Sequence, residues 1–269
     1  MLGAATVRAL ALGQLELENA ADNPPMFASG HIDRTISPRQ NQLLAALTAA
    51  ELEPLLPHMT LTGMTLGIVL HDPGSKMDDM YFPISGVVSL LYTLEDGHTT
   101  ELAIVGNDGC VGIALLLGGE TTPSQAIVQI AGYAYRVSSS VIVAAFRKGD
   151  GTSRVLLRYV QSLITQMVQT AVCNRHHTVE QQLCRWLLLS LDRLPSNKVR
   201  MTQELISNML GVRRSGITEA ARKLQAAGVI EYTRGRITVP DRAKLETHAC
   251  ECYAVVKKET DRLDRAGIP

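Results

Sequence analysis

The sequence predicts an α+β protein: a β-barrel of the double-stranded β-helix (jelly-roll-like) type, then a long helix, then two short helices with a hairpin. Three observations predict this class. Short β-rich runs fill residues 59–143, a helical apolar period follows in 152–174, and two amphipathic helices precede a hairpin in 201–239. We therefore expect a flexible extension (1–36), a β domain (37–150), a long helix (151–175), a helical domain (176–245) and a helical tail (246–269).

The first 36 residues show no sustained period, and Asp22-Asn23-Pro24-Pro25 interrupts any helix that precedes it. An Ala- and Leu-rich helix over residues 4–18 is the alternative to a flexible extension. Leucines at helical spacing then predict a helix over residues 40–56.

Six β-rich runs predict the strands of the β domain, at residues 66–70, 80–83, 87–94, 99–105, 126–130 and 134–137. Between the third run and the fourth lies Glu95-Asp96-Gly97-His98, in which Asp-Gly tolerates the positive φ values of a tight hairpin. The pattern alone leaves a barrel and a two-sheet sandwich open.

The long helix carries a narrow stripe at a 4-3-4-3-4 spacing, formed by Leu156, Val160, Leu163, Met167, Thr170 and Asn174. This spacing is typical of the seam of a two-stranded coiled coil, so it predicts that two copies of the chain associate. The alternative is that the stripe packs on the helix's own β domain. A second helix is expected over residues 179–194.

The net charge of zero is a cancellation between segments. Residues 1–150 hold 7 basic and 15 acidic residues, whereas residues 151–236 hold 13 basic and 5 acidic ones. Such asymmetry indicates separate domains with separate partners, and the basic segment is suited to nucleic acid.

Within the basic segment, Thr202 can cap a first helix and Gly211 can supply the sharp turn that follows it. Apolar residues at i, i+3, i+4 and i+7 from Ile217 mark a second helix. Strands at 229–232 and 236–239 then flank the turn Thr233-Arg234-Gly235. This is the pattern of a winged helix-turn-helix, whose second helix fits the ~12 Å major groove of DNA.

Arginines at the start of the second helix can bond guanine, Glu219 can accept from a cytosine amine, and hairpin arginines suit phosphates. The candidate DNA contacts are Thr202, Arg213, Arg214, Ser215, Thr218, Glu219, Arg222, Arg234 and Arg236. The alternative is a solvated helical hairpin whose arginines aid solubility.

Four stretches carry a resemblance to a known family: YFPISGVVSL (81–90), GNDGCVG (106–112), MTQELI (201–206) and LGVRRSGIT (210–218). Over about residues 40–245 the chain resembles the Crp/Fnr family of bacterial transcription regulators. The resemblance implies a homodimer on a near-palindromic double-stranded DNA site, with RNA polymerase as a partner if the protein activates. It also implies that Arg214 is the principal base-reading residue, although Arg213 stands where the family often has Ser or Thr.

The resemblance places an effector pocket at Gly112, Ile113, Ser124 and Gln125. Family members that bind cyclic AMP have Gly-Glu-Leu at the first place and Arg-Ser or Arg-Thr at the second. Here these places read Gly112-Ile113-Ala114 and Pro123-Ser124-Gln125-Ala126. Because a buried phosphate without a counter-charge is costly, we expect no control by cyclic AMP, and the effector is unknown.

No metal or cofactor is expected. Family members with an iron–sulfur cluster use N-terminal cysteines, and this chain has none before Cys110. His71, His98, His176 and His177 are haem-ligand candidates by residue type alone, and we interpret the last two as hinge residues between domains. Cys250-x-Cys252 is too tight for a zinc knuckle and has no partner pair at suitable spacing, although a redox role is an alternative.

Other function classes find no support. No apolar run approaches the ~20 residues that span a bilayer, and the N-terminus has no secretory pattern. Five cysteines at irregular spacing favour a reducing cytoplasm. The sequence contains no phosphate-binding loop, nucleophile elbow or pair of catalytic carboxylates that would indicate an enzyme. The competing hypothesis is a ligand-sensing or scaffold protein whose helix-turn-helix no longer reads DNA.

Overall fold

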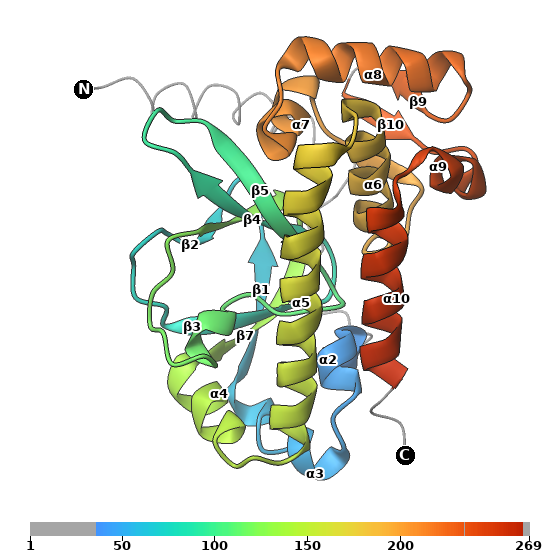
Figure 1. Cartoon of the computed structure of the whole chain (residues 1–269). Helices are drawn as coiled ribbons and strands as arrows, with labels where there is room; N and C mark the ends of the chain where they lie inside the picture. Colours follow the sequence, from blue (N-terminus) through green and yellow to red (C-terminus); the bar gives the residue numbers. More distant parts are fainter. Residues whose placement is uncertain (1–35, 234, 266–269) are drawn as a thin grey trace, which may run out of the picture.

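The computed structural model describes residues 36–233 and 235–265. A two-sheet domain packs against one side of the long helix α5 (Gly151–His176), and a smaller C-terminal domain lies at one end of that helix (Figure 1). The predicted α+β class is confirmed. The predicted extension, apart from Ile36, lies outside the described residues.

Two antiparallel sheets form the N-terminal domain in place of one closed barrel. The first has the order β1 (Met59–Met64), β7 (Gly132–Ser138) and β3 (Asp79–Pro83), and the second has the order β2 (Val69–His71), β6 (Gln125–Ile130), β4 (Val87–Thr93) and β5 (Thr99–Val105). Both sheets contribute to one apolar core, with Phe82 and Met80 from the first and Val88 and Val128 from the second. The predicted β4–β5 hairpin forms, with φ +88° at Gly97.

The helix predicted over residues 40–56 is broken into shorter pieces. These are η1 (Pro38–Gln40), α2 (Gln42–Ala45), α3 (Ala49–Leu52) and η2 (Leu56–His58). Thr48 and Glu51 form a reciprocal capping box that starts a new helix, which is why the leucine period does not continue as one helix. The Asn41 amide donates to the carbonyls of Pro83 and Gly109, both at 2.8 Å, and so fixes these turns to the sheets.

Helix α5 is packed on its own domain, after the short helix α4 (Ser139–Phe146). Leu156, Val160 and Leu163 are buried in the core between the sheets and the helix. The Gln166 amide accepts from the backbone N–H of Ile104 and donates to its carbonyl, so the helix is also tied to β5.

This packing corrects the predicted coiled-coil seam. The side chains of Leu156, Val160 and Leu163 are already buried within one chain, because the β domain needs them to close its core. Met167 and Thr170 are half-buried, and Asn174 is exposed. The apolar residues that α5 leaves exposed are Leu157, Ile164, Val168 and Val172.

The C-terminal domain is built around Trp186 of α6 (Val179–Leu191). It continues with β8 (Lys198–Arg200), α7 (Gln203–Leu210), α8 (Arg214–Ala226), β9 (Glu231–Thr233), β10 (Arg236–Thr238) and α9 (Arg242–His248). The predicted hairpin pairs as expected, and β8, which we did not predict, joins it in the order β8-β10-β9. Val87 and Ile104 of the second sheet belong to the same apolar core, so the two domains share buried surface.

The last helix, α10 (Glu251–Arg265), lies alongside α5 (Figure 1). The Gln161 amide donates to Glu259 at 2.9 Å, and the hydroxyls of Ser162 and Thr260 are 2.9 Å apart. From Glu251 to Arg265 the predicted tail is therefore a helix docked on the long helix, whereas its first residues, 246–248, complete α9. Among the described helices, none has the length and apolar character to cross a membrane.

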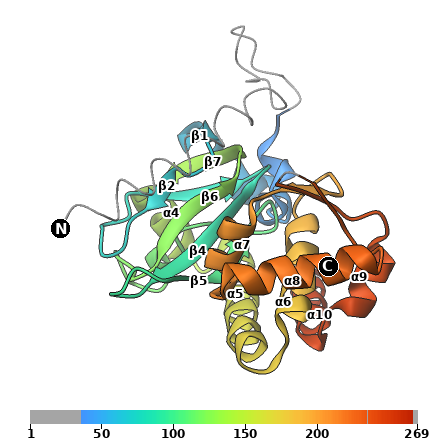
Figure 2. The same ribbon diagram turned by 90° about the horizontal axis from the view of Figure 1, so that it is seen from above.

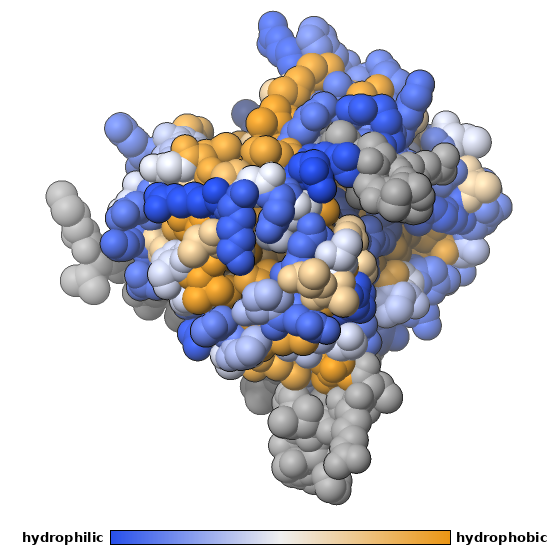
Figure 3. Space-filling model, turned by 90° about the horizontal axis from the view of Figure 1, so that it is seen from below, coloured by the Kyte–Doolittle hydropathy of each residue, from blue (hydrophilic) through white to orange (hydrophobic). Residues whose placement is uncertain are grey.

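The end of the molecule opposite α8 shows apolar residues in several separate patches among hydrophilic ones (Figure 3). Scattered apolar surface of this kind is ordinary for a folded protein.

A buried ion pair joins the two domains. Arg193, two residues after the end of α6, is 2.6 Å from Asp108 of the β domain, and their side chains are 6% and 17% exposed. A Cβ atom on Gly106 would lie 2.7 Å from the Cβ of Arg193, so the backbone of the β domain approaches this side chain closely.

We predict that Arg193→Met lowers the free energy of unfolding by about 3 kcal/mol, because it leaves a poorly solvated Asp108 carboxylate without its partner. Lys76→Met is the matched control, since the Lys76–Glu120 pair is 64% and 70% exposed. Lys76→Met should lower the free energy of unfolding by under about 1 kcal/mol. Urea titration of both variants measures the difference, and equal costs would contradict the structural role of the interdomain pair.

A second buried acid lies at the same interface. Glu101 of β5 is 7% exposed, and burial raises its pKa to about 7, against the opposing effects of the Ser89 hydroxyl, 2.6 Å away, and of Arg185 and Arg193. The folded protein therefore holds a proton on Glu101 between pH 4.5 and about 7 that the unfolded chain releases.

We predict that stability falls as the pH rises through this window, since the stabilising contribution of the raised pKa is present below pH 4.5 and lost above about 7. Glu101→Gln should remove this part of the pH dependence. Above pH 7 its free energy of unfolding should be larger than that of wild type by roughly 1–3 kcal/mol. The exposed Glu95→Gln serves as the control. Urea titrations at several pH values test this, and an unchanged pH profile for Glu101→Gln would refute the assignment.

Candidate nucleic-acid interface

Helices α7 and α8 are set at their angle by a cap and a glycine. The Thr202 hydroxyl accepts from the backbone N–H of Leu205 at 3.2 Å, which starts α7. Helix α7 ends at Gly211, whose φ of +65° is left-handed and favours glycine. A Cβ there would also lie 2.8 Å from the Thr100 hydroxyl oxygen, so a side chain at this position would require Thr100 to move.

Helix α8 has one buried and one exposed face, as predicted. Ile217, Ala220, Ala221 and Leu224 are buried in the core of the C-terminal domain. The exposed positions include the predicted contacts Arg213, Arg214, Ser215, Thr218, Glu219 and Arg222. In Figure 2, α8 runs across the near end of the molecule in front of the rest of its domain. The structure thus brings the predicted helix residues together on one accessible surface.

Two of these side chains already have partners within the domain. The Thr218 hydroxyl is 2.7 Å from Gln203 Oε1 and 3.0 Å from the Arg214 carbonyl, so it links α8 to the start of α7. Glu219 is paired with Lys223 at 2.9 Å, and this cation lowers the pKa of the Glu219 carboxyl. Glu219 would have to exchange this partner to accept from a base.

The hairpin lies beside the start of α7. The Tyr232 hydroxyl donates to the Met201 carbonyl at 3.2 Å, and burial raises the pKa of Tyr232. Arg236 is exposed on β10, opposite Arg200 in the strand register. Arg234 lies outside the described residues.

The helix-turn-helix also touches the β domain, which the sequence did not predict. The Thr99 hydroxyl donates to the Asn208 carbonyl at 3.3 Å, next to the Thr100–Gly211 contact. The hairpin of β4 and β5 therefore contacts α7 and the turn before α8.

The residues of the predicted effector pocket lie around β2 and the start of β6. Gly112 has φ +112°, and the Nε2 of His71 is 3.5 Å from where its Cβ would be. Burial lowers the pKa of His71, whose sheet partner is Ala126. The hydroxyls of Ser124 and Thr122 are 2.9 Å apart, and the buried Gln125 donates to Asp72 at 3.3 Å. Ile113 packs against the apolar core.

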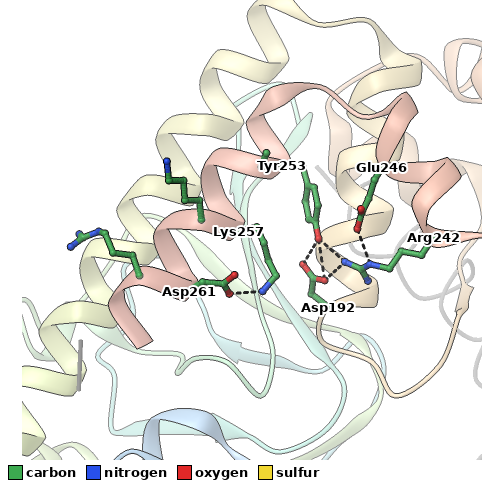
Figure 4. A pocket seen from close by; sticks show the side chains of 9 residues that line it. Asp192, Arg242, Glu246, Tyr253, Lys257 and Asp261 are labelled. Carbon is green, nitrogen blue, oxygen red and sulfur yellow. Dashed lines mark hydrogen bonds and ion pairs between the residues drawn. The ribbon is translucent and has the colours of Figure 1, made fainter. Parts of the chain in front are cut away.

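A separate groove of about 870 Å³ is lined by α9, α10 and the end of α6. Figure 4 shows the Tyr253 ring and the Arg242 guanidinium pointing toward Asp192. Arg242 pairs with Asp192 and with Glu246, and burial near Asp192 raises the pKa of Tyr253 to about 12. These charges satisfy one another, so they serve to hold α10 against α6 and α9.

A cluster of potential metal ligands is also present, which the sequence did not predict. Cys173 and His177 at the end of α5 meet Cys250 and Cys252 at the start of α10, with ligand atoms all within 4.8 Å of one another. The available signal was the Cys-x3-His spacing, which puts both residues on one face of a helix. Their partners are more than seventy residues away in the chain, and only folding brings them together.

Comparison with known proteins agrees with this arrangement. A model of the cyclic nucleotide-binding domain matches residues 66–148, and a model of the Crp-like helix-turn-helix domain matches residues 181–248. Together they cover more than half of the chain. No curated protein sequence matches it.

Solved structures share the fold at low sequence identity. FixK2 from Bradyrhizobium japonicum is 16% identical with a TM-score of 0.60, and the match covers 71% of this chain and 98% of that one. The c-di-GMP responsive global regulator CLP of Xanthomonas campestris is 18% identical with a TM-score of 0.59, covering 71% and 99%. A CRP-family transcriptional regulator from Thermus thermophilus is 17% identical with a TM-score of 0.60, covering 70% and 96%. With both of its characteristic domains matched in the same order, this chain belongs to the Crp/Fnr family of transcription regulators.

Proposed function

We propose that the protein is a sequence-specific DNA-binding regulator that binds a near-palindromic site as a homodimer. The observation that carries this proposal is the exposed face of α8, where Arg213, Arg214 and Arg222 stand out from a helix whose other face is buried. A helix of this kind enters the major groove with its N-terminal residues toward the base edges.

The exposed side chains divide into two roles. Arg214 stands in the first turn of α8, where a guanidinium can bond guanine O6 and N7. Arg222 is two turns further on, and Arg236 is on the hairpin, so both suit phosphate contacts. Residues 198–236 carry 8 basic and 3 acidic residues, and affinity should therefore fall steeply with added salt.

The dimer would form through the exposed face of α5. Leu157, Ile164, Val168 and Val172 are 41–53% exposed in the single chain and follow one stripe of the helix. Two such stripes packed around a two-fold axis would bury this apolar surface. The recognition helices would then reach major grooves about one helical turn, ~34 Å, apart, which requires a near-palindromic site.

We further propose that cyclic AMP is not the effector. Ile113 offers no carboxylate for a ribose hydroxyl, and Ser124 and Gln125 offer no cation for a cyclic phosphate. If an effector binds elsewhere in the β domain, the β4–β5 contact with α7 and the turn at Gly211 is a direct route to the DNA-binding unit. RNA polymerase would be a partner if the protein activates transcription.

We predict that Arg214→Ala weakens binding to the preferred site by about 1–3 kcal/mol and relaxes its base preference, because a bidentate base contact is lost. Arg154→Ala removes the same charge from the far end of α5 and should leave affinity unchanged. Fluorescence anisotropy with duplexes selected from a random pool measures both variants. If Arg214→Ala and Arg154→Ala read the same sequences equally well, α8 does not read bases and the scaffold hypothesis is favoured.

We predict that Val168→Glu converts the dimer to a monomer, since it places a charge in the centre of the proposed apolar contact. Leu117→Glu, at a residue 60% exposed in the β domain, is the matched control and should remain dimeric. Sedimentation velocity gives the oligomeric state, and circular dichroism checks that both variants fold. A monomeric wild type, or a dimeric Val168→Glu, would rule out this interface.

A further inference from the structure

Four potential metal ligands meet where the long helix ends and the last helix begins. Cys173 is in the last turn of α5, and His177 follows it as the residue that caps the helix. Cys250 precedes α10, and Cys252 lies in its first turn. The three cysteines are at most 5% exposed, and the His177 side chain is 13% exposed.

Two of the distances between these atoms are close to the edges of a zinc tetrahedron, and all of them are within 4.8 Å. Zn–S bonds of about 2.3 Å and Zn–N bonds of about 2.0–2.1 Å imply S···S edges of roughly 3.8 Å and S···N edges of roughly 3.5 Å. The Sγ atoms of Cys173 and Cys250 are 3.5 Å apart, and Cys252 Sγ is 3.6 Å from His177 Nδ1. No rearrangement larger than a few tenths of an ångström is needed along these two edges.

The second nitrogen of His177 provides an independent indication. Its Nε2 is 3.2 Å from the carboxylate of Glu251, which is itself exposed. Metal-bound histidines usually donate their other N–H to such a carboxylate, which fixes the ring and the tautomer. Glu251 would thus hold Nδ1 toward the cysteines as a free acceptor.

The surroundings also supply charge balance and support. Three thiolates and one imidazole around Zn²⁺ carry a net negative charge, and the buried Arg185 lies close enough to Cys173 and Cys252 to interact with both. The Gln182 amide donates to the carbonyls of Cys173 and His177, and so holds the end of α5 that carries these ligands.

We propose that Cys173, His177, Cys250 and Cys252 form a structural Cys3His zinc site. Soft thiolates with one imidazole in tetrahedral array select Zn²⁺. All four ligands lie outside the segments that the two family models match, 66–148 and 181–248. The site joins α5, which supports the β domain, to α10, which follows the helix-turn-helix, and it does not depend on the proposed DNA binding.

The competing outcome is a disulfide between Cys173 and Cys250. Its formation would release two protons and two electrons to an oxidant, and it would leave Cys252 and His177 without a shared role. Metal analysis and thiol counting of the same sample distinguish the two.

The test begins with the full chain, purified without added metal or chelator. We expect an equimolar amount of zinc by inductively coupled plasma mass spectrometry, and all five cysteines reduced when the denatured protein is titrated for thiols. Replacement by Co²⁺ should give the intense visible bands of tetrahedral thiolate coordination. Metal-free protein, iron in place of zinc, or a Cys173–Cys250 disulfide would each overturn the proposal.

Variants then assign the ligands. Cys252→Ser and His177→Gln should lose most of the bound zinc, whereas Cys110→Ala and Cys184→Ala, which change equally buried cysteines outside the cluster, should retain it. In wild type, a strong chelator should expose α10 to proteolysis, and added Zn²⁺ should restore protection. If the ligand variants keep full zinc content, or if the controls lose it equally, the assignment is wrong.

Discussion

The packing of α5 against its own β domain determines the rest of the structure. Leu156, Val160 and Leu163 close the core between the two sheets, and Gln166 bonds both backbone groups of Ile104. With that face buried, only the stripe from Leu157 to Val172 is left for a second chain. The same packing fixes the end of the helix, and hence the position of Cys173 and the start of α6.

The C-terminal domain, which contains the helix-turn-helix, is held against the β domain at several points. Val87 and Ile104 belong to the same buried core as Trp186, Arg193 pairs with Asp108, and the Thr99 hydroxyl donates to the backbone of α7. Buried charges such as Arg193 and Glu101 are costly unless they are paired or neutral, so this interface is sensitive to small rearrangements. Because β5 contacts the helix-turn-helix directly, an effector that moved β5 would also move the helix-turn-helix.

The sequence predicted the local patterns well and the long-range contacts poorly. Thr202, Gly211 and the apolar period from Ile217 are short-range signals, and all of them appear in the structure as predicted. The 4-3-4-3-4 stripe of α5 was predicted to face a second chain, because a periodic pattern records that a face is buried but not what buries it. The pairing of Cys173 and His177 with Cys250 and Cys252 depends on how α10 docks, which no local pattern contains.

We propose that two copies of α8, related by a two-fold axis, read DNA. The most direct measurement is a hydroxyl-radical footprint of the full chain on duplexes selected from a random pool. We expect a near-palindromic selected sequence, with two protected segments related by a dyad and about one helical turn, ~34 Å, apart. Recovery of no common sequence, or of a single protected segment without symmetry, would contradict it.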